Sequence, residues 1–448
     1  MEPLRGACGA TPIAAPAMTR AVAAPLVRAP LAATGWRDGV AYGALGLPLA
    51  FVALPLYVML PNHYATTFGV PLAALGALLL GARLFDAVTD PWIGRLVDRW
   101  FARSAARVLG AAALAAVAAA VGFHALFFPP MQGTASLLAW CGAWLLWTYV
   151  AYSVLAVLHQ AWGARLGGDA TQRARVVAWR EGFALTGVLV ASVLPALAGM
   201  GAATATFAVV LALGVALLSR APRALGTTAP GGVMPMTLPL ADAAFRRLLA
   251  VFLVNGIASA VPATLVLFFI RDRLQAPAFE PLFLASYFAA GALSMPLWVR
   301  LVRRFGLVRT WLAGMLLAVA AFAWAAALGT GDVAGFAAVC VASGLALGAD
   351  LALPGALLAG VIQRSGRGGQ AEGAYFGWWN FATKLNLALA AGLALPLLQA
   401  FGYTPGSRDA DALAALTLAY CALPCVLKLA AAALLATRMR RGAGGAPE

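Results

Sequence analysis

The chain has 448 residues, of which 63% are hydrophobic and 10% are charged, whereas soluble proteins carry roughly 25% charged residues. So few charges cannot cover a surface that faces water, and so many apolar residues exclude a disordered chain. The net charge of +15 comes from basic residues in short segments between apolar runs, not from one basic patch. We therefore expect an integral membrane protein with the lipid bilayer around it and no nucleic-acid partner.

Apolar runs divide the chain into twelve predicted membrane-spanning helices, each near or above the roughly 20 residues that a span needs. The first six are 38–60, 71–97, 105–128, 135–163, 174–199 and 202–219. The second six are 244–270, 279–301, 307–329, 333–362, 371–401 and 410–437. We expect two six-helix halves, 37–219 and 244–437, joined by a linker at 220–243, with a disordered tail at 1–36 and a basic tail at 438–448.

Arginines mark alternate loops of this predicted topology. The loops after odd-numbered spans carry only Arg271, Arg273 and Arg408, and the remaining loops carry most of the others. Because cytoplasmic loops are enriched in Lys and Arg, both termini are predicted to be cytoplasmic.

An internal repeat supports a division into two equivalent halves. The end of the second span (91–99) and the end of the eighth (296–304) both fit the pattern P-x-x-x-R-L-V-x-R. This match at corresponding places indicates a duplicated six-helix unit around a central cavity, which is the major-facilitator architecture of an all-α membrane protein.

The second predicted span contains two carboxylates at membrane depth, where ionisable groups are costly and indicate function. Asp86 and Asp90 are four residues apart on one helical face, Arg83 lies one turn earlier, and Thr89 adds a hydroxyl. Oxygen ligands of this kind suit a small cation, and two adjacent carboxylates can instead hold a proton between them. The alternative is a structural ion pair with Arg83.

Lysine is rare in this chain, with only Lys384 and Lys428 present. Lys384 lies among apolar residues, and a buried ammonium needs a carboxylate partner. We expect it to occupy the aspartate pair when no cation is bound. Lys428 lies nearer a helix end, so we expect its side chain to extend toward the membrane surface.

Other polar residues inside predicted spans are candidates for a solute site. Asp350 in the tenth span is predicted to face the cavity or to pair with Arg180, which lies beside Glu181 in the fifth span. A gating ion pair is the alternative for the latter two, and His159 is a candidate proton or substrate group. The predicted substrate-binding set is Arg83, Arg180, Asn255, Asp350, Trp379 and Asn380.

The segment Gly94-Arg95-Leu-Val-Asp98-Arg99 is the charged-loop motif typical of major facilitators. We expect it to hold the two halves together in the outward-facing state through Asp98 and its arginines. The predicted latch consists of Gly94, Arg95, Asp98, Arg99, Glu181 and Glu372.

Three segments together carry a family resemblance. Residues 83–99 resemble the second-helix signature of the glycoside–pentoside–hexuronide:cation symporters, 172–180 resemble the motif between that family's fourth and fifth helices, and 372–384 with 402–406 resemble its eleventh helix. The resemblance implies that Asp86 and Asp90 are paired cation-binding aspartates. It further implies that Lys384 is the lysine facing them and that Ser153 is a hydroxyl at the same site.

The chain departs from that family at the positions that would hold a sugar. The family has acidic residues on its first and fourth helices, where this chain has Gly46 and Ala156, and Gln160 stands at a nearby tryptophan position. The coupling residues are thus retained without the known sugar clamp, which puts a disaccharide substrate in doubt.

These observations predict a secondary transporter and not an enzyme. The transporter is expected to couple symport of a small organic solute, such as a sugar or glycoside, to Na⁺ or H⁺ by alternating access. We expect a monomer in a bacterial cytoplasmic membrane, with no cofactor beyond the coupling ion and no metal site except for Na⁺ at Asp86 and Asp90. The alternatives are a cation-coupled transporter of lysolipids or other amphipathic solutes and a membrane sensor that does not transport.

Overall fold

The computed structural model describes residues 35–53, 55–223, 235–403 and 406–442, and these residues form helices joined by short loops. Most of the predicted tails and part of the predicted linker lie outside the described residues. The N-terminal elements are α1 (Trp36–Gly43), α2 (Gly46–Phe51), η1 (Pro55–Met59), α3 (Leu60–Phe68), α4 (Leu72–Arg103), α5 (Ala105–Phe127), α6 (Thr134–Arg165) and α7 (Ala170–Leu218). The C-terminal elements are α8 (Leu238–Ala241), α9 (Ala243–Phe268), η2 (Phe269–Arg273), η3 (Pro277–Phe279), α10 (Glu280–Ala325), α11 (Val333–Arg364), α12 (Glu372–Ala400), α13 (Ala410–Thr417), η4 (Leu418–Ala422) and α14 (Leu423–Gly442).

The first predicted span is broken into several pieces, so the expectation of one helix over 38–60 is wrong. Helices α1 and α2, the π-helical η1 and α3 follow one another there. Pro48, Pro55 and Pro61 lie in this region, and each proline lacks the amide hydrogen that would continue a regular helix.

Two long helices each contain two predicted spans separated by a glycine. Gly199 in α7 has φ 81° and Gly306 in α10 has φ 77°. Positive φ is readily adopted by glycine and turns the chain between two helical segments. Both turns fall at or beside predicted span boundaries.

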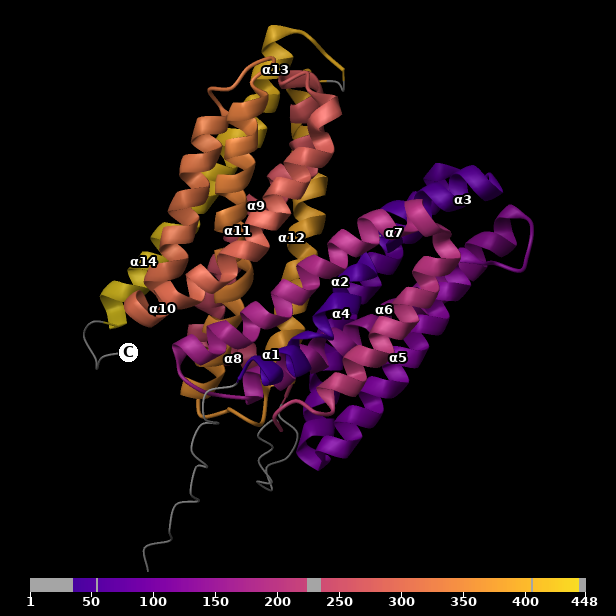
Figure 1. Cartoon of the computed structure of the whole chain (residues 1–448), viewed down its shortest axis with the longest axis vertical. Coiled ribbons are helices and arrows are strands. Elements are labelled where there is room, and N and C mark those ends of the chain that lie inside the picture. Colours follow the sequence, from indigo (N-terminus) through magenta and orange to yellow (C-terminus); the bar gives the residue numbers. More distant parts are fainter. Residues whose placement is uncertain (1–34, 54, 224–234, 404–405, 443–448) are drawn as a thin grey trace, which may run out of the picture.

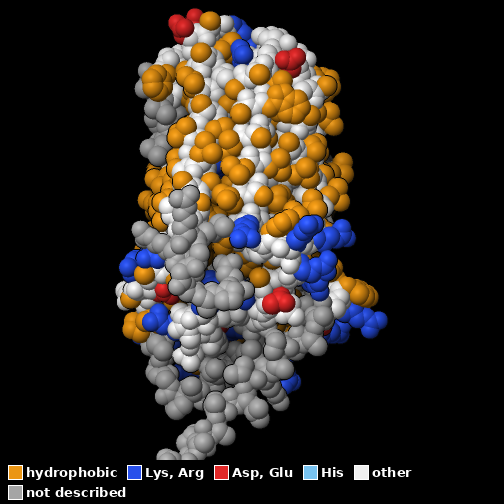
Figure 2. All heavy atoms as spheres, turned by 90° about the vertical axis from the view of Figure 1, so that its left-hand side faces the viewer, with side chains coloured by type: hydrophobic (Ala, Val, Ile, Leu, Met, Phe, Trp, Pro, Cys, Tyr) orange, Lys and Arg blue, Asp and Glu red, His pale blue; other side chains and the backbone are white. Residues whose placement is uncertain are grey.

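Eight of the described helical segments are long and apolar enough to cross a membrane. These eight segments cover nine of the predicted spans, because Pro277–Ala325 contains two of them, whereas the first span, α4 and α12 are not among the eight. The count of twelve spans therefore stays a prediction. Figure 2 shows a broad hydrophobic surface on one side of the molecule, bordered at its lower edge by Lys and Arg side chains.

The helices form two bundles that diverge at one end of the molecule (Figure 1). Helices α1 to α7 form one bundle and α9 to α14 the other, and the ends near α3 and α13 are far apart while those near α1 and α8 converge. The bundles pack against each other mainly along α4 with α12 and along α7 with α10 and α11. Residues that meet between the bundles therefore come from α4, α6, α7, α10, α11 and α12.

Candidate functional site

Helices α4, α6 and α12 bring two aspartates, a serine and a lysine together between the bundles. The Lys384 Nζ lies 2.7 Å from Asp86 Oδ2 and 2.8 Å from Asp90 Oδ2. It also donates to Ser153 Oγ at 2.9 Å, and Ser153 Oγ donates to Asp86 Oδ1 at 2.7 Å. We call Asp86, Asp90, Ser153 and Lys384 the interface cluster.

Close backbone contact between α4 and α12 positions this cluster. A Cβ atom at Gly377 of α12 would lie 2.6 Å from the Asp90 carbonyl oxygen, and one at Gly94 of α4 would lie 2.1 Å from the Gly373 carbonyl oxygen. Glycine at these points lets the two helices approach closely enough for Lys384 to reach both aspartates.

The interface cluster has more negative than positive charge and is incompletely bonded. Both carboxylates are buried, but only one ammonium faces them. Apart from the ion pair with Lys384, neither carboxylate oxygen of Asp90 has a hydrogen-bond partner within the described structure. Buried polar atoms are rarely left in this condition without a functional reason. A cation or a proton at this point would compensate the excess charge.

The other two residues predicted for α4 have different surroundings. The Thr89 hydroxyl donates to the backbone oxygen of Asp86 at 3.0 Å, one turn back in the same helix. Arg83 is exposed and is not among the residues that line the central cavity. The structure therefore places neither side chain on the Asp86 or Asp90 carboxylate oxygens by a described contact.

A central cavity of about 280 Å³ lies beside the interface cluster and is lined from both bundles. Lys384 is 18% exposed and lines this cavity together with Ser153. Of the predicted substrate residues, Arg180, Asp350, Trp379 and Asn380 also line it, with Glu181, Gln160, Tyr152 and Phe252.

Both aromatic and charged groups line this cavity. The Trp379 ring stacks on Phe252 with centroids 3.7 Å apart, and Arg180 donates to Glu181 Oε1 from both Nε and Nη2. A cavity lined by a stacked aromatic pair and by an ion pair suits a solute with both an apolar face and several polar groups.

A second cavity of about 210 Å³ shares Arg180 and Glu181 with the first and extends toward α2. Gly46 and Ala156, the positions that lack the family's acidic residues, both line it. A Cβ atom at Gly46 would lie 2.4 Å from the Arg180 carbonyl oxygen, so an acidic side chain does not fit there. His159 also lines this cavity, and its Nε2 lies 2.7 Å from the Tyr42 carbonyl oxygen.

Lys428 is buried inside the C-terminal bundle, which corrects the expectation that its side chain reaches the membrane surface. Its Nζ donates to Asp350 Oδ2 at 2.7 Å, Asn255 Oδ1 at 2.9 Å and Ser259 Oγ at 3.0 Å. Asp350 Oδ1 accepts hydrogen bonds from Asn255 Nδ2 at 3.1 Å and Trp311 Nε1 at 2.9 Å. We call Asn255, Ser259, Trp311, Asp350 and Lys428 the C-terminal cluster.

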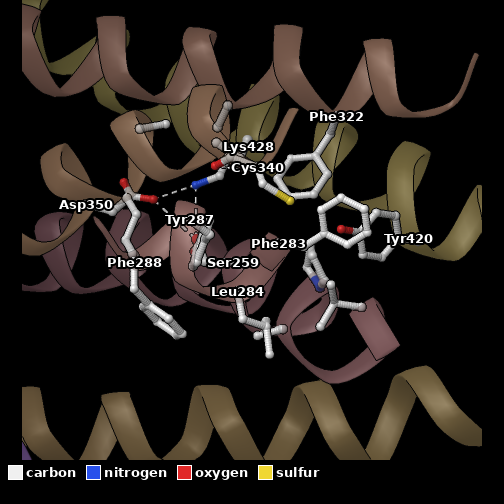
Figure 3. A pocket seen from close by; sticks show the side chains of 17 residues that line it. Ser259, Phe283, Leu284, Tyr287, Phe288, Phe322, Cys340, Asp350, Tyr420 and Lys428 are labelled. Atoms are coloured by element: carbon white, nitrogen blue, oxygen red, sulfur yellow. Dashed lines mark hydrogen bonds and ion pairs between the residues drawn. The ribbon is translucent and has the colours of Figure 1, made fainter. Parts of the chain in front are cut away.

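The C-terminal cluster corrects two further expectations. The partner of Asp350 is Lys428 and not Arg180, which pairs with Glu181 instead. Asn255 bonds to this ion pair and does not line the central cavity. Figure 3 shows Lys428 and Asp350 at one end of a mainly apolar pocket that continues past Tyr287 and Phe283 toward Tyr420.

An ionic network closes the convergent end of the bundles. Asp98 of α4 accepts hydrogen bonds from Arg165 Nη2 at 2.7 Å and from the backbone amides of Gly373 and Ala374 at 2.7 and 2.8 Å. The same Arg165 nitrogen lies 2.9 Å from Glu372 Oε2. The network joins residues of α4 and α6 to the first turn of α12, and thus one bundle to the other.

Three members of the predicted latch, Gly94, Asp98 and Glu372, belong to this closed region. Arg165 is a further member of this ionic network. It was not predicted from the sequence, because it resembles the other loop arginines. Glu181 lies at the central cavity instead, and Arg95 and Arg99 form no ion pair with the described residues.

One family model matches most of the chain. The model of the family described as MFS/sugar transport protein matches residues 39–438. YagG of Escherichia coli K12, whose name assigns it provisionally to the glycoside/cation symporters, is 28% identical over 159 residues, which are 35% of this chain and 34% of YagG. The inner membrane symporter YicJ of the same organism is 27% identical over 159 residues, 35% of this chain and 33% of YicJ. The matched stretch thus spans about a third of these relatives.

Solved structures share the fold at low sequence identity. A bacterial homologue of the iron transporter ferroportin in an outward-facing state has a TM-score of 0.67 and 14% identity, covering 90% of this chain and 99% of that one. The transporter FucP in its outward conformation has a TM-score of 0.63 and 14% identity, covering 88% and 98%. The human organic anion transporter MFSD10 has a TM-score of 0.58 and 17% identity, covering 90% and 100%. The fold is therefore that of the major facilitator superfamily.

Proposed function

Because the chain belongs to the MFS/sugar transport protein family, we propose that this membrane transporter couples uptake of a sugar-like or glycoside-like solute to Na⁺ or H⁺. The interface cluster is the observation that carries the proposal. The names of YagG and YicJ as symporters agree with it, and we place the protein in a bacterial cytoplasmic membrane with both termini inside.

The coupling ion binds at Asp86 and Asp90 and releases Lys384 from them. With the ion absent, the single ammonium bridges two buried carboxylates from the opposite bundle. An arriving Na⁺ takes the carboxylate oxygens and the Ser153 hydroxyl as ligands, or a proton neutralises one carboxylate. In either case Lys384 loses part of its attraction to α4 and turns toward the cavity that it already lines.

The solute binds in the adjoining central cavity. The Trp379 and Phe252 stack offers an apolar surface to a ring, while Arg180, Glu181 and Asn380 offer charged and amide groups to hydroxyls. This set replaces the acidic residues that the family carries at positions 46 and 156, so the bound sugar differs in orientation or in size. A ligand beside Lys384 also stabilises the amine after it leaves the aspartates, which links solute binding to ion binding.

Alternating access follows from the two regions where the bundles contact each other, α4 with α12 and α7 with α10 and α11, which we call the two seams. In this structure the Asp98, Arg165 and Glu372 network closes the convergent end, and the bundles diverge at the other (Figure 1). The charge distribution of the loops makes the closed end cytoplasmic, which corresponds to an outward-facing state. Ion and solute binding shift the population toward a state in which this network is open.

Uptake into membrane vesicles tests the coupling. Asp90→Asn and Lys384→Ala are each expected to abolish concentrative uptake under an imposed sodium or proton gradient, while the protein still folds and inserts. The matched control is Asp411→Asn, which removes a carboxylate from the exposed start of α13 and leaves uptake unchanged. Concentrative uptake in either cluster variant would contradict the proposal.

A further inference from the structure

The seam at α7 and α10 carries a groove that the proposed transport site does not use. The groove holds about 630 Å³ and is walled by Trp179 and Phe183 from one bundle and by Met295 and Val299 from the other. Its volume lies within the range of pockets that hold small organic molecules. It shares no lining residue with the central cavity, so it is a separate site.

Two arginines line this groove, one from each bundle. Arg175 belongs to α7 and Arg300 to α10. Within the part of the chain that the structure describes, no carboxylate oxygen lies within 4.0 Å of either guanidinium. The other seam, α4 with α12, is closed by carboxylates and an arginine, whereas the described lining of this groove has one arginine from each bundle and no carboxylate.

The arginines lie at the level where phospholipid headgroups lie. Position 175 is five residues beyond the start of α7 at Ala170, which is about 7.5 Å along a helix. Arg300 is six residues before the turn at Gly306, about 9 Å away by the same rise. Trp36, at the start of α1, also lines the groove, and tryptophan is enriched at the membrane–water boundary.

The apolar walls lie deeper in the membrane than the arginines. Phe183 is two turns beyond Arg175 in α7, and Met295 is more than one turn before Arg300 in α10. The groove is thus cationic at its headgroup end and apolar toward the bilayer centre, which is the complement of one anionic lipid molecule.

We propose that this groove binds an anionic phospholipid, with the phosphate between Arg175 and Arg300 and an acyl chain along Trp179 and Met295. The chain's own N-terminal segment is a poor occupant of the groove, because residues 1–34 carry three arginines against one glutamate. Its net positive charge would repel Arg175 and Arg300, whereas a lipid phosphate attracts them. The lipid phosphate provides the anion that joins the bundles along this seam. It thereby stabilises the state that the protein network closes at α4 and α12.

Native mass spectrometry of the full-length protein in detergent tests the lipid site, with phosphatidylglycerol and phosphatidylcholine of the same chains as probes. The wild-type protein is expected to retain phosphatidylglycerol and to lose phosphatidylcholine. Arg175→Gln and Arg300→Gln each weaken retention about fivefold, and the double variant about 25-fold, since one arginine near a lipid headgroup contributes roughly 1 kcal/mol. Arg304→Gln, an exposed arginine of α10 outside the groove, leaves retention unchanged.

A second variant separates loss of binding from loss of folding. Met295→Trp keeps both arginines but fills the apolar wall, and it is expected to reduce phosphatidylglycerol retention while monodispersity in gel filtration is preserved. Equal retention of phosphatidylcholine, an equal loss in Arg304→Gln, or displacement of the lipid by millimolar glycerol 1-phosphate would each overturn the proposal. The last result would identify a site for free phosphate.

Discussion

The interface cluster and the C-terminal cluster use the same residue types in opposite ways. In the C-terminal cluster one lysine meets one aspartate, Lys428 makes three hydrogen bonds, and Asn255 and Trp311 complete the bonding of Asp350. In the interface cluster one lysine meets two aspartates, and Asp90 has no hydrogen bond besides its ion pair within the described structure. The fully hydrogen-bonded ion pair of the C-terminal cluster stabilises its bundle. The incompletely bonded carboxylates of the interface cluster, which lie between the two bundles, can instead bind a cation.

The largest expected difference between the clusters is in stability. Asp350→Asn leaves the buried Lys428 ammonium without its carboxylate, and the free energy of unfolding is expected to fall by about 3–5 kcal/mol. Asp90→Asn is the matched change in the interface cluster and is expected to cost less than about 1 kcal/mol, because it removes one of two like charges. Denaturant titration of the detergent-purified proteins measures both, and equal losses would break the comparison.

Ion binding gives the next largest effect. A coupling cation at about 100 times its Kd is expected to raise the free energy of unfolding by roughly 2.7 kcal/mol. Thermal unfolding in sodium, lithium or potassium at several pH values measures the gain and distinguishes sodium from the proton. The gain disappears in Asp90→Asn but persists in a C-terminal double variant, Asp350→Asn with Lys428→Met. Cation stabilisation that survives Asp90→Asn places the ion elsewhere.

The same double variant is expected to recover most of the stability that Asp350→Asn loses. Replacing both members of a buried ion pair by neutral groups of similar size is often close to neutral, so the variant should lie within roughly 1.5 kcal/mol of the wild type. Denaturant titration of the single and double variants forms the cycle. A double variant as unstable as Asp350→Asn would show that the pair does not act as a closed unit.

Ser153→Ala is expected to produce the smallest effect. It removes the hydrogen bond to Asp86 and the acceptor for Lys384, which lowers the free energy of unfolding by about 1 kcal/mol. If Ser153 is also an ion ligand, the half-saturating cation concentration rises about fivefold. Ser343→Ala is the control that leaves this concentration unchanged, because this buried hydroxyl donates to the Cys340 carbonyl oxygen and has no other hydrogen bond among the described residues.

Sequence reasoning identified the interface cluster because every member carried a visible signal. Asp86 and Asp90 are carboxylates in an apolar run, Lys384 is one of two lysines, and the resemblance supplied Ser153. The major-facilitator fold followed from hydropathy, loop arginines and the repeat. The first span was misjudged because its prolines lie in an otherwise continuous apolar run, and hydropathy does not register missing amide hydrogens.

The C-terminal cluster and Arg165 could not be assigned in this way. Lys428 of α14 and Asp350 of α11 are 78 positions apart, and only their contact in the folded structure shows that they are partners. Arg165 lies at a helix end among several loop arginines. A charge that orients the chain in the membrane and one that joins two bundles look alike until tertiary contacts are known.

The hydrogen bonds from the Gly373 and Ala374 amides to Asp98 have a consequence for hydration. These amides belong to the first turn of α12, where no earlier carbonyl of the helix is available to accept them. When the convergent end opens, Asp98 withdraws and water must take its place on those amides. Opening therefore requires hydration of this helix end. Osmolytes that lower water activity are expected to slow opening without binding at the ion or solute sites.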